Sequence, residues 1–336
     1  MMTSRFSFEL PESLIAQTPT EKRGASRLMV VHRGSNIEHR QFDDIVHYIN
    51  SGDLLILNDT KVTPCRLIGV NDLGKEIDIL LVEDLGDNRY SILTKGKNTY
   101  NVTFNDNLCA KIIKGKEAEF FCKGDFRETL WQIGNMPLPP YIKRRPDNSD
   151  KERYQTVYAK NEGSIAAPTA GIHFTDSIIK SLISKGVIIK SITLHVGIGT
   201  FRPIKVDDIN DHKMLDEYFE INTDVIAEIS ETKKRKNKVI LVGTTSTRTL
   251  EAYFSGQFKI IKETDKMISA KKDIFIKPGH KFIVPDCLLT NFHLPCSTPL
   301  LLVSAFAGID TILKSYKEAI DVGYRFFSYG DAMILM

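Results

Sequence analysis

The chain has 336 residues, of which 42% are hydrophobic and 26% charged, and its formal net charge is +3 at neutral pH. That length predicts two domains, because single hydrophobic cores seldom grow beyond ~250 to 300 residues. No run approaches the ~18 apolar residues of a membrane span, and the N-terminus lacks a signal-peptide pattern, so we expect a cytoplasmic protein without a membrane partner. The five cysteines are scattered without Cys-x-x-Cys spacing, which argues against a zinc site or a redox pair.

The first sixty residues predict the start of an α/β domain. Residues 27–32 and 53–57 have the apolar pattern of strands, and residues 42–49 predict a short helix between them. Asp59 follows the second strand, where ligand contacts are common in an α/β sheet, although a turn-forming aspartate is an equal alternative.

From residue 62 onward the pattern changes to short strands separated by turn residues. We expect these strands at 65–70, 76–82, 89–93, 101–104, 108–113 and 118–122. Their close spacing is typical of a small barrel. The predicted fold is therefore an α/β main domain formed by residues 1–61 and 151–336, interrupted at 62–150 by a small all-β, barrel-like domain with its return linker.

Two later segments are poor in bulky side chains and rich in glycine, alanine and threonine. They run from Gly163 to Thr175 and from Leu194 to Pro203. Glycine permits backbone angles and close approaches that a Cβ forbids, so such loops suit a backbone that wraps a ligand. The candidate site residues in these loops are Thr169, Gly171, His173, His195, Gly197, Gly199 and Thr200.

A run of hydroxyl residues between a strand at 239–242 and a helix predicts a second part of the site. The run is Gly243 to Thr247, with Arg248 near the helix start. A helix N-terminus has free amides that bind a carboxylate or phosphate, and capping accounts for only one of four hydroxyls. Arginine adds bidentate geometry. The candidate contacts are Thr244, Thr245, Ser246 and Arg248.

One tract is clearly basic. Residues 233–281 carry 13 Lys or Arg against 4 Asp or Glu. An RNA backbone would suit such a surface, because neutralising phosphates releases counterions, although a solvated helix end explains the first lysines equally well. The candidate RNA contacts are Lys233, Lys234, Arg235, Lys236 and Lys238.

Seven blocks, in one order, together with the two glycine-rich loops, resemble the S-adenosylmethionine:tRNA ribosyltransferase-isomerases of queuosine synthesis. The blocks are residues 6–16, 52–62, 136–142, 154–159, 242–251, 290–295 and 324–333. The resemblance implies transfer of the ribosyl part of S-adenosylmethionine to 7-aminomethyl-7-deazaguanine at the wobble position of a tRNA with a G-U-N anticodon. The products would be epoxyqueuosine-tRNA, adenine and methionine. It also implies a monomer with no bound prosthetic group and no metal, since S-adenosylmethionine is consumed as a co-substrate.

That reaction needs a base to remove a proton from the ribose carbon beside the sulfonium. The histidines in the resembling segments are His173, His195, His212 and His293, and imidazole titrates in the right range, although each is more often a structural residue. Asp59 is the further catalytic candidate, and Asn291 and His293 are the further substrate contacts.

The chain departs from the family pattern at two informative positions. Lys61 stands where the family commonly has arginine, and Leu215 stands where it commonly has histidine. Leucine cannot carry a proton, so if the family's histidine were the base, this chain would need a neighbouring residue for that role.

Two other functions compete. A doubly wound methyltransferase would place a glycine-rich turn after its first strand, and residues 54–61 contain no glycine. A non-catalytic RNA-binding module built on the β insert would need a basic groove with stacking aromatics, and the insert is nearly neutral.

Overall fold

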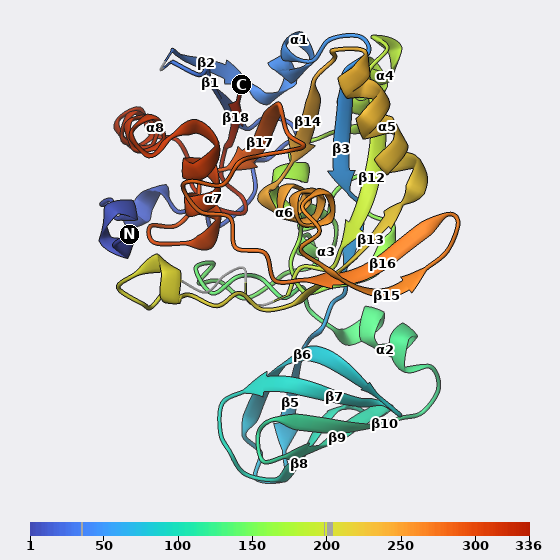
Figure 1. Ribbon diagram of the computed structural model, residues 1–336. Helices are drawn as coiled ribbons and strands as arrows, with labels where there is room; N and C mark the ends of the chain where they lie inside the picture. The colour runs from blue at the N-terminus through green and yellow to red at the C-terminus, as the bar shows by residue number, and fades with distance from the viewer. Residues whose placement is uncertain (35, 198, 200–203) are drawn as a thin grey trace.

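A computed structural model describes residues 1–34, 36–197, 199 and 204–336. It contains a ten-stranded mixed sheet flanked by helices, and a separate closed barrel of six strands that lies below the sheet in Figure 1. The expected fold class, an α/β main domain with an inserted all-β barrel, is confirmed.

Four parallel strands form the centre of the large sheet, and antiparallel pairings join further strands to it on both sides, where β1 and β18 are again parallel to each other. The order is β15-β16-β13-β12-β3-β14-β17-β18-β1-β2, and β12, β3, β14 and β17 are parallel. The central strands are β12 (Ile188–Leu194), β3 (Leu54–Asn58), β14 (Val239–Val242) and β17 (Cys287–Asn291). The outer strands are β15 (Lys259–Glu263), β16 (Met267–Lys272), β13 (Glu217–Asn222), β18 (Ala332–Leu335), β1 (Arg27–Val31) and β2 (Ile37–Gln41).

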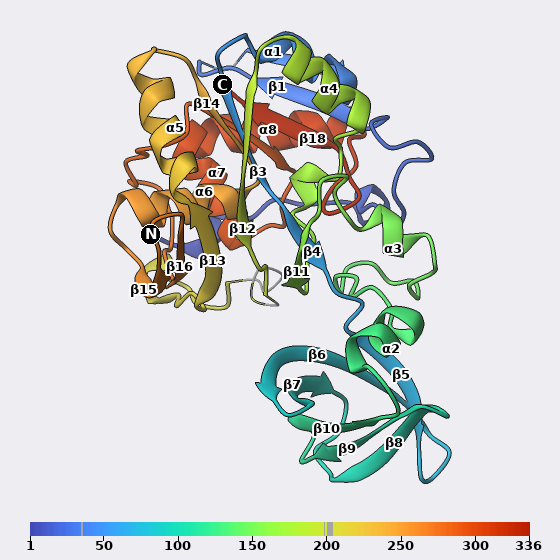
Figure 2. The ribbon, with the colours of Figure 1, turned by 90° about the vertical axis from the view of Figure 1, so that its right-hand side faces the viewer.

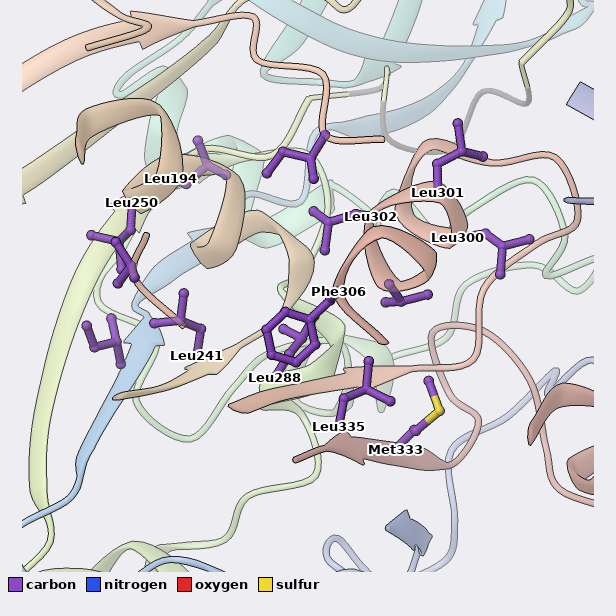
Figure 3. Close-up of a cluster of buried hydrophobic side chains, with 14 of the residues drawn as sticks. Leu194, Leu241, Leu250, Leu288, Leu300, Leu301, Leu302, Phe306, Met333 and Leu335 are labelled. Atoms are coloured by element: carbon purple, nitrogen blue, oxygen red, sulfur yellow. The ribbon is translucent and has the colours of Figure 1, made fainter. Parts of the chain in front are cut away.

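Helices cover both faces of this sheet because its central strands are apolar on both sides. In β3, Leu54 and Ile56 pack into one core while Leu55 and Leu57 pack into the other, as the two-residue period of a strand requires. The first core lies under α5 (Thr223–Lys234), α6 (Thr244–Phe254), α7 (Thr298–Ala307) and α8 (Ile309–Asp321), and the second under α1 (Ile45–Tyr48) and α4 (Asp176–Ser184). Figure 3 shows part of the first core, with leucines of α6 and α7 over those of the strands.

The apolar helices of this structure contribute their buried side chains to the hydrophobic cores. Within the described part of the chain, no individual helix has the length and hydropathy to cross a membrane; α7 and α8 pass that test only when taken together, and they meet at 115°.

The barrel has a hydrophobic core of its own. Its strands follow the order β10-β7-β6-β5-β8-β9 around the closed wall. They are β5 (Arg66–Asn71), β6 (Glu76–Gly86), β7 (Arg89–Thr94), β8 (Tyr100–Asn105), β9 (Leu108–Ile113) and β10 (Glu117–Cys122). The following helix α2 (Phe126–Ile133) closes one end, since its Leu130 is buried in the barrel core.

The barrel is joined to the carboxyl-terminal edge of the parallel strands. β3 leads into β4 (Thr60–Val62), which pairs with β11 (Asn161–Ser164) and then enters the barrel at β5 (Figure 2). On the way back, Met136 and Leu138 pack against Tyr154 and Ala167 of the main body, and α3 (Asp150–Arg153) lies beside the junction. Both connections between the main domain and the barrel therefore lie close to the carboxyl-terminal ends of the parallel strands.

Shorter 3-10 helices complete the described structure. They are η1 (Thr3–Phe6), η2 (Glu12–Leu14), η3 (Phe42–Asp44), η4 (Thr169–Gly171) and η6 (Ile209–Asp211).

Candidate active site

A pocket with an empty volume of about 670 Å³ opens at the carboxyl-terminal edge of the parallel strands. Ligands of open α/β sheets bind at this edge, because the loops that leave neighbouring strands diverge there. The pocket brings together five of the predicted substrate contacts, which come from three distant parts of the chain: Thr169, Thr244, Thr245, Asn291 and His293.

Two helix N-termini reach the same pocket. Gly243 ends β14 with a φ of +90°, so that α6 starts at once, and Thr244 and Thr245 of its first turn line the pocket. Ser297, the N-cap of α7, and Pro299 line it from the other side. Helix N-termini present free amides and a partial positive charge, so the pocket favours an anionic group.

Thr245 has an unsatisfied hydroxyl in this pocket. Its side chain is 6% exposed, and Oγ1 has no hydrogen-bond partner within the described structure. A buried hydroxyl without a partner is costly, so Thr245 Oγ1 is a natural contact for a bound ligand.

His173 lies behind the pocket and holds Asn291 in place. Its Nδ1 is 2.7 Å from Ser26 Oγ, and its Nε2 is 3.0 Å from Asn291 Nδ2. Burial, followed by the charges of Arg23 and Arg325, lowers the pKa of His173 to about 3. With both ring nitrogens engaged and the ring neutral, the geometry suits positioning better than proton transfer.

His293 lines the pocket directly. Its Nε2 lies 2.8 Å from Thr290 Oγ1, and Tyr316 accepts a hydrogen bond from the His293 backbone. Burial lowers the pKa of His293 to about 3, so the neutral ring is a hydrogen-bonding group at neutral pH.

His195 and Asp59 belong to a neighbouring polar cluster on the other side of β12. The next residue, Val196, lines the pocket, whereas the His195 ring stacks on Tyr218 and lies over Gly163. Asp59 accepts hydrogen bonds from three side chains, Ser191, Thr193 and Asn161. These bonds occupy the carboxylate, so Asp59 shapes this cluster rather than offering a free base.

His195 keeps one ring nitrogen available. Nδ1 lies 2.8 Å from Thr60 Oγ1, and that hydroxyl also donates to the carbonyl of Asn161. This pattern assigns the ring proton to Nδ1 and leaves Nε2 as an acceptor with no partner among the described residues. Burial lowers the pKa of His195, against an opposing effect of Glu220 and Asp59.

Arg248 and Ser246 point away from the pocket. Arg248 binds Glu217 with an Nη2–Oε2 distance of 2.6 Å, and Lys272 binds the same carboxylate at 2.9 Å. Burial opposes ionisation of Glu217, but the two cations lower its pKa to about 2. Ser246 donates to the carbonyl of Val242, one helical turn back.

The glycines of the predicted site serve packing as well as access. A Cβ at Gly171 would lie 2.1 Å from the Tyr158 hydroxyl, and one at Gly199 would lie 3.1 Å from Leu215 Cδ1. Gly197 has open space on its Cβ side, and Thr200 lies outside the described residues.

His212 is placed apart from the pocket. It follows η6, and its ring packs edge-on against Phe275. Leu215, which stands where the family commonly has histidine, is 54% exposed.

The predicted RNA-binding lysines lie at the opposite end of the sheet. Lys238 precedes β14, and its backbone binds the Asp53 carboxylate just before β3 begins. Figure 1 shows α5 ending at this edge, away from the barrel. Three of the five cations are paired with acids: Lys233 with Asp286, Lys234 with Glu231, and Arg235 with Glu228.

Sequence reasoning missed several pocket residues. Tyr141, Ser297, Phe327 and Ser328 also line the pocket, and the Tyr141 hydroxyl lies 2.6 Å from Ser328 Oγ. Three of them lie within blocks that carry the family resemblance, at 136–142 and 324–333, which was the available signal. Across the described residues, no cluster of three or more His, Cys, Asp or Glu side chains is arranged to hold a metal ion.

The structure is that of an α/β protein with an inserted barrel and a pocket at the sheet edge that faces the barrel. A profile of the queuosine biosynthesis protein family matches residues 3–335. Similar proteins include S-adenosylmethionine:tRNA ribosyltransferase-isomerases of Thermodesulfovibrio yellowstonii and Halothermothrix orenii, with 46% and 47% identity over 100% of both chains. The crystal structure of an S-adenosylmethionine tRNA ribosyltransferase from Thermotoga maritima has a TM-score of 0.57 and 34% identity, covering 99% of this chain and 100% of that one. The chain belongs to the queuosine biosynthesis protein family, and it is an enzyme of the transferase class.

Proposed function

We propose that the protein transfers and isomerises the ribosyl moiety of S-adenosylmethionine onto 7-aminomethyl-7-deazaguanine at the wobble position of a G-U-N tRNA. The products are epoxyqueuosine-tRNA, adenine and methionine. The observation that carries the proposal is the pocket in which the N-termini of α6 and α7 meet beside the unpartnered hydroxyl of Thr245. A cytoplasmic monomer remains our expectation.

In this proposal the methionine carboxylate of S-adenosylmethionine lies at the start of α6. The free amides there and Thr245 Oγ1 supply donors, and the helix dipole adds a favourable partial charge. Asn291, Thr290 and His293 line the opposite wall and offer hydrogen bonds to the ribose or the adenine. Adenine leaves more easily when donors support its developing negative charge.

His195 is the proposed general base. It combines an open ring nitrogen with a second nitrogen fixed by Thr60, the arrangement that a proton acceptor requires. His293 is held in the same way by Thr290, but burial lowers its pKa to about 3, which makes it the weaker proton acceptor. His195 lies on the side of β12 next to β4 and β11, where the chain crosses to the barrel. The target base of the tRNA would enter from that side.

The test is incubation of the purified protein with S-adenosylmethionine and a G-U-N tRNA that carries 7-aminomethyl-7-deazaguanine. Free adenine is measured together with the modified nucleosides by mass spectrometry. We expect epoxyqueuosine and adenine in equal amounts. A methylated tRNA with S-adenosylhomocysteine would instead identify a methyltransferase.

Two variants connect the activity to the pocket. Thr245→Val removes the unpartnered hydroxyl and should raise the KM for S-adenosylmethionine several-fold. The matched control is Ser246→Ala, on the same helix turn, whose hydroxyl binds the carbonyl of Val242 and does not line the pocket. Equal effects of both variants would exclude carboxylate binding at this helix start.

A further inference from the structure

Four cations near the pocket bind backbone carbonyls instead of carboxylates. They lie on α3, on the loop of residues 18–23 and in the loop between α8 and β18, and we call them the cationic strip: Arg23, Lys151, Arg153 and Arg325. Within the described structure none of the four forms an ion pair with an acidic side chain. No direct ion pair therefore neutralises these four side chains, unlike Lys233, Lys234 and Arg235.

Hydrogen bonds link the members of the strip into one surface. Arg23 donates to the carbonyls of Glu152, Gln155 and Ile172 at 2.8, 2.7 and 3.1 Å. Arg153 donates in the reverse direction, to the carbonyls of Thr20 and Glu21.

Three further hydrogen bonds, one from Arg325 and two from Lys151, extend the strip at its ends. Arg325 donates to the carbonyl of Thr18, and Lys151 donates to the carbonyls of Trp131 and Gln132 at the end of α2. The strip thus runs from the base of β18 to the helix that closes the barrel.

The electrostatics of the strip support an external anion. Burial and then the charge of Arg153 lower the pKa of Arg23, while the exposed acids Glu152 and Asp176 only partly oppose this effect. The Nε atom of Arg153 is buried and has no hydrogen-bond partner in the described structure. Cations that repel one another and keep an unused donor gain free energy when an anion binds.

The strip also borders the substrate pocket. A smaller hollow, with an empty volume of about 270 Å³, is lined by Arg23, Arg153, His173 and Ser328, and Ser328 also lines the main pocket. In Figure 2, α3 lies beside the junction between the main body and the barrel. An RNA strand on the strip would pass the pocket on its way to the barrel.

We propose that the cationic strip binds the phosphate backbone of the tRNA next to the modified nucleotide, and that the lysines after α5 do not. This inference rests on the proposed function, because it takes the tRNA as the substrate. Arginine and lysine contacts to phosphates position a nucleic acid and make its affinity depend on salt.

The experiment measures tRNA binding by fluorescence anisotropy across a range of salt concentrations. The test variant is Arg153→Gln/Arg325→Gln, and the matched control is Lys236→Gln/Lys238→Gln at the far edge of the sheet. We expect the test variant to bind tRNA at least tenfold more weakly at low salt, with a salt slope lower by ~1 per lost phosphate contact. The control should keep the wild-type slope.

Loss of the arginines removes hydrogen bonds that hold the loop of residues 18–23, so a charge-preserving variant accompanies them. Arg153→Lys/Arg325→Lys removes the guanidinium forks but keeps both charges, and it should restore the salt slope even if thermal unfolding shows a lower Tm. S-adenosylmethionine binding, measured by calorimetry, should stay within about twofold of the wild type in all variants, because none of the substituted residues lines the main pocket.

Three outcomes would overturn the proposal: an unchanged slope in Arg153→Gln/Arg325→Gln, a reduced slope in the lysine control, or loss of S-adenosylmethionine binding without a change in tRNA slope. The wild-type protein separates this failure from failure of the proposed function. If it binds tRNA and releases adenine while the test variant keeps its slope, only the strip is misassigned.

Discussion

Asn291 donates a hydrogen bond from its side-chain amide to Nε2 of His173, at 3.0 Å. The same amide nitrogen lies 3.2 Å from the carbonyl of Phe327, which can only accept, so the nitrogen end of the side chain is identified by its neighbours. His173 Nε2 is then an acceptor, and its proton is on Nδ1, facing Ser26. Since the Asn291 oxygen accepts from Thr169, this chain of bonds fixes two pocket residues in one orientation.

A positioning role for His173 predicts rescue by glutamine. His173→Ala should raise the KM for S-adenosylmethionine at least tenfold, because Asn291 loses its acceptor and can rotate. His173→Gln offers an amide oxygen near the position of Nε2 and should recover most of the loss. Steady-state kinetics check this, and a comparable fall in kcat for both variants, with an altered pH profile, would assign His173 to proton transfer instead.

The same histidine predicts a loss of stability in acid. The folded-state pKa is about 3 and the ordinary value is 6.5, so between these values the unfolded chain binds a proton that the folded protein does not. The contribution of the neutral ring is fully present above pH 6.5 and falls as the pH is lowered through that window, by at most about 1.4 kcal/mol per pH unit. Urea unfolding at pH 7 and pH 5 should show a loss about 2 kcal/mol larger in the wild type than in His173→Gln. Equal losses in the two proteins would contradict the assignment.

A general base at His195 predicts a distinct pH profile. Its lowered pKa keeps the ring neutral at neutral pH, so kcat/KM should stay flat from neutral pH downward until it declines at a pH below 6.5. His195→Gln should lower kcat by about 10² to 10⁴-fold, with tRNA affinity within about twofold of the wild type. Thr60→Val is the companion variant. It removes the partner of Nδ1 and should shift the pH at which kcat/KM declines, without abolishing turnover. A His195→Gln protein that retains the wild-type profile would rule out this base.

Periodicity and turn residues predicted the parts of the fold that depend on neighbouring residues in the chain. The six barrel strands fall within two residues of the expected bounds, except that β6 extends to Gly86. Strands β13, β15 and β16 were not predicted. β15 is exposed along its whole length, and its apolar residues Ile260 and Ile261 are adjacent instead of alternating with polar ones. It therefore lacks the alternating pattern that identifies a half-buried strand. β15 pairs with β16, its neighbour in the chain, and β16 pairs with β13 from far earlier in the chain, so tertiary context rather than local pattern stabilises these strands.

The candidate site shows the same division. Thr169 was a candidate because it lies in a loop poor in bulky side chains, Thr244 because it starts a helix, and Asn291 because it lies in a block of the family resemblance. The structure brings all three to one pocket at the ends of the parallel strands. Arg248 occupies the same helix start in sequence, but its side chain lies on the face toward β13 and β16 and pairs with Glu217. Which face a helical side chain takes depends on the packing of α6 against the sheet, and that packing is not encoded in a motif of ten residues.

The buried partner of Arg248 leads to a stability prediction. Glu217, Arg248 and Lys272 are each at most 8% exposed, and burial lowers the pKa of Lys272 to about 8 despite the neighbouring carboxylate. Glu217→Gln would leave two buried cations without that charge and should cost about 3 to 5 kcal/mol of unfolding free energy. Adding Lys272→Met should recover part of the loss, because it removes one of the two cations. Chemical denaturation measures both, and a double variant no more stable than Glu217→Gln would contradict this account.

A last prediction concerns Glu162, which joins the two domains. This residue of β11 accepts hydrogen bonds from Trp131 and Arg127 of α2, and it pairs with Lys61 of β4 at 3.1 Å. The Lys61 ammonium also lies 4.3 Å from the centre of the Trp131 ring. Lys61, which stands where the family commonly has arginine, therefore belongs to a contact that holds α2, and with it the barrel, against the main body.

Glu162→Gln should loosen this contact, because a neutral amide binds two cations and an indole less strongly than a carboxylate. Trp131 is the single tryptophan of the chain, so its fluorescence reports on the junction directly. We expect faster quenching by acrylamide and a higher KM for tRNA, while S-adenosylmethionine binding stays unchanged. Lys61→Arg keeps the charge and serves as the control with wild-type quenching. If Glu162→Gln shows the quenching and the tRNA KM of the wild type, packing of α2 alone holds the barrel, and the ion cluster has no part in presenting the tRNA.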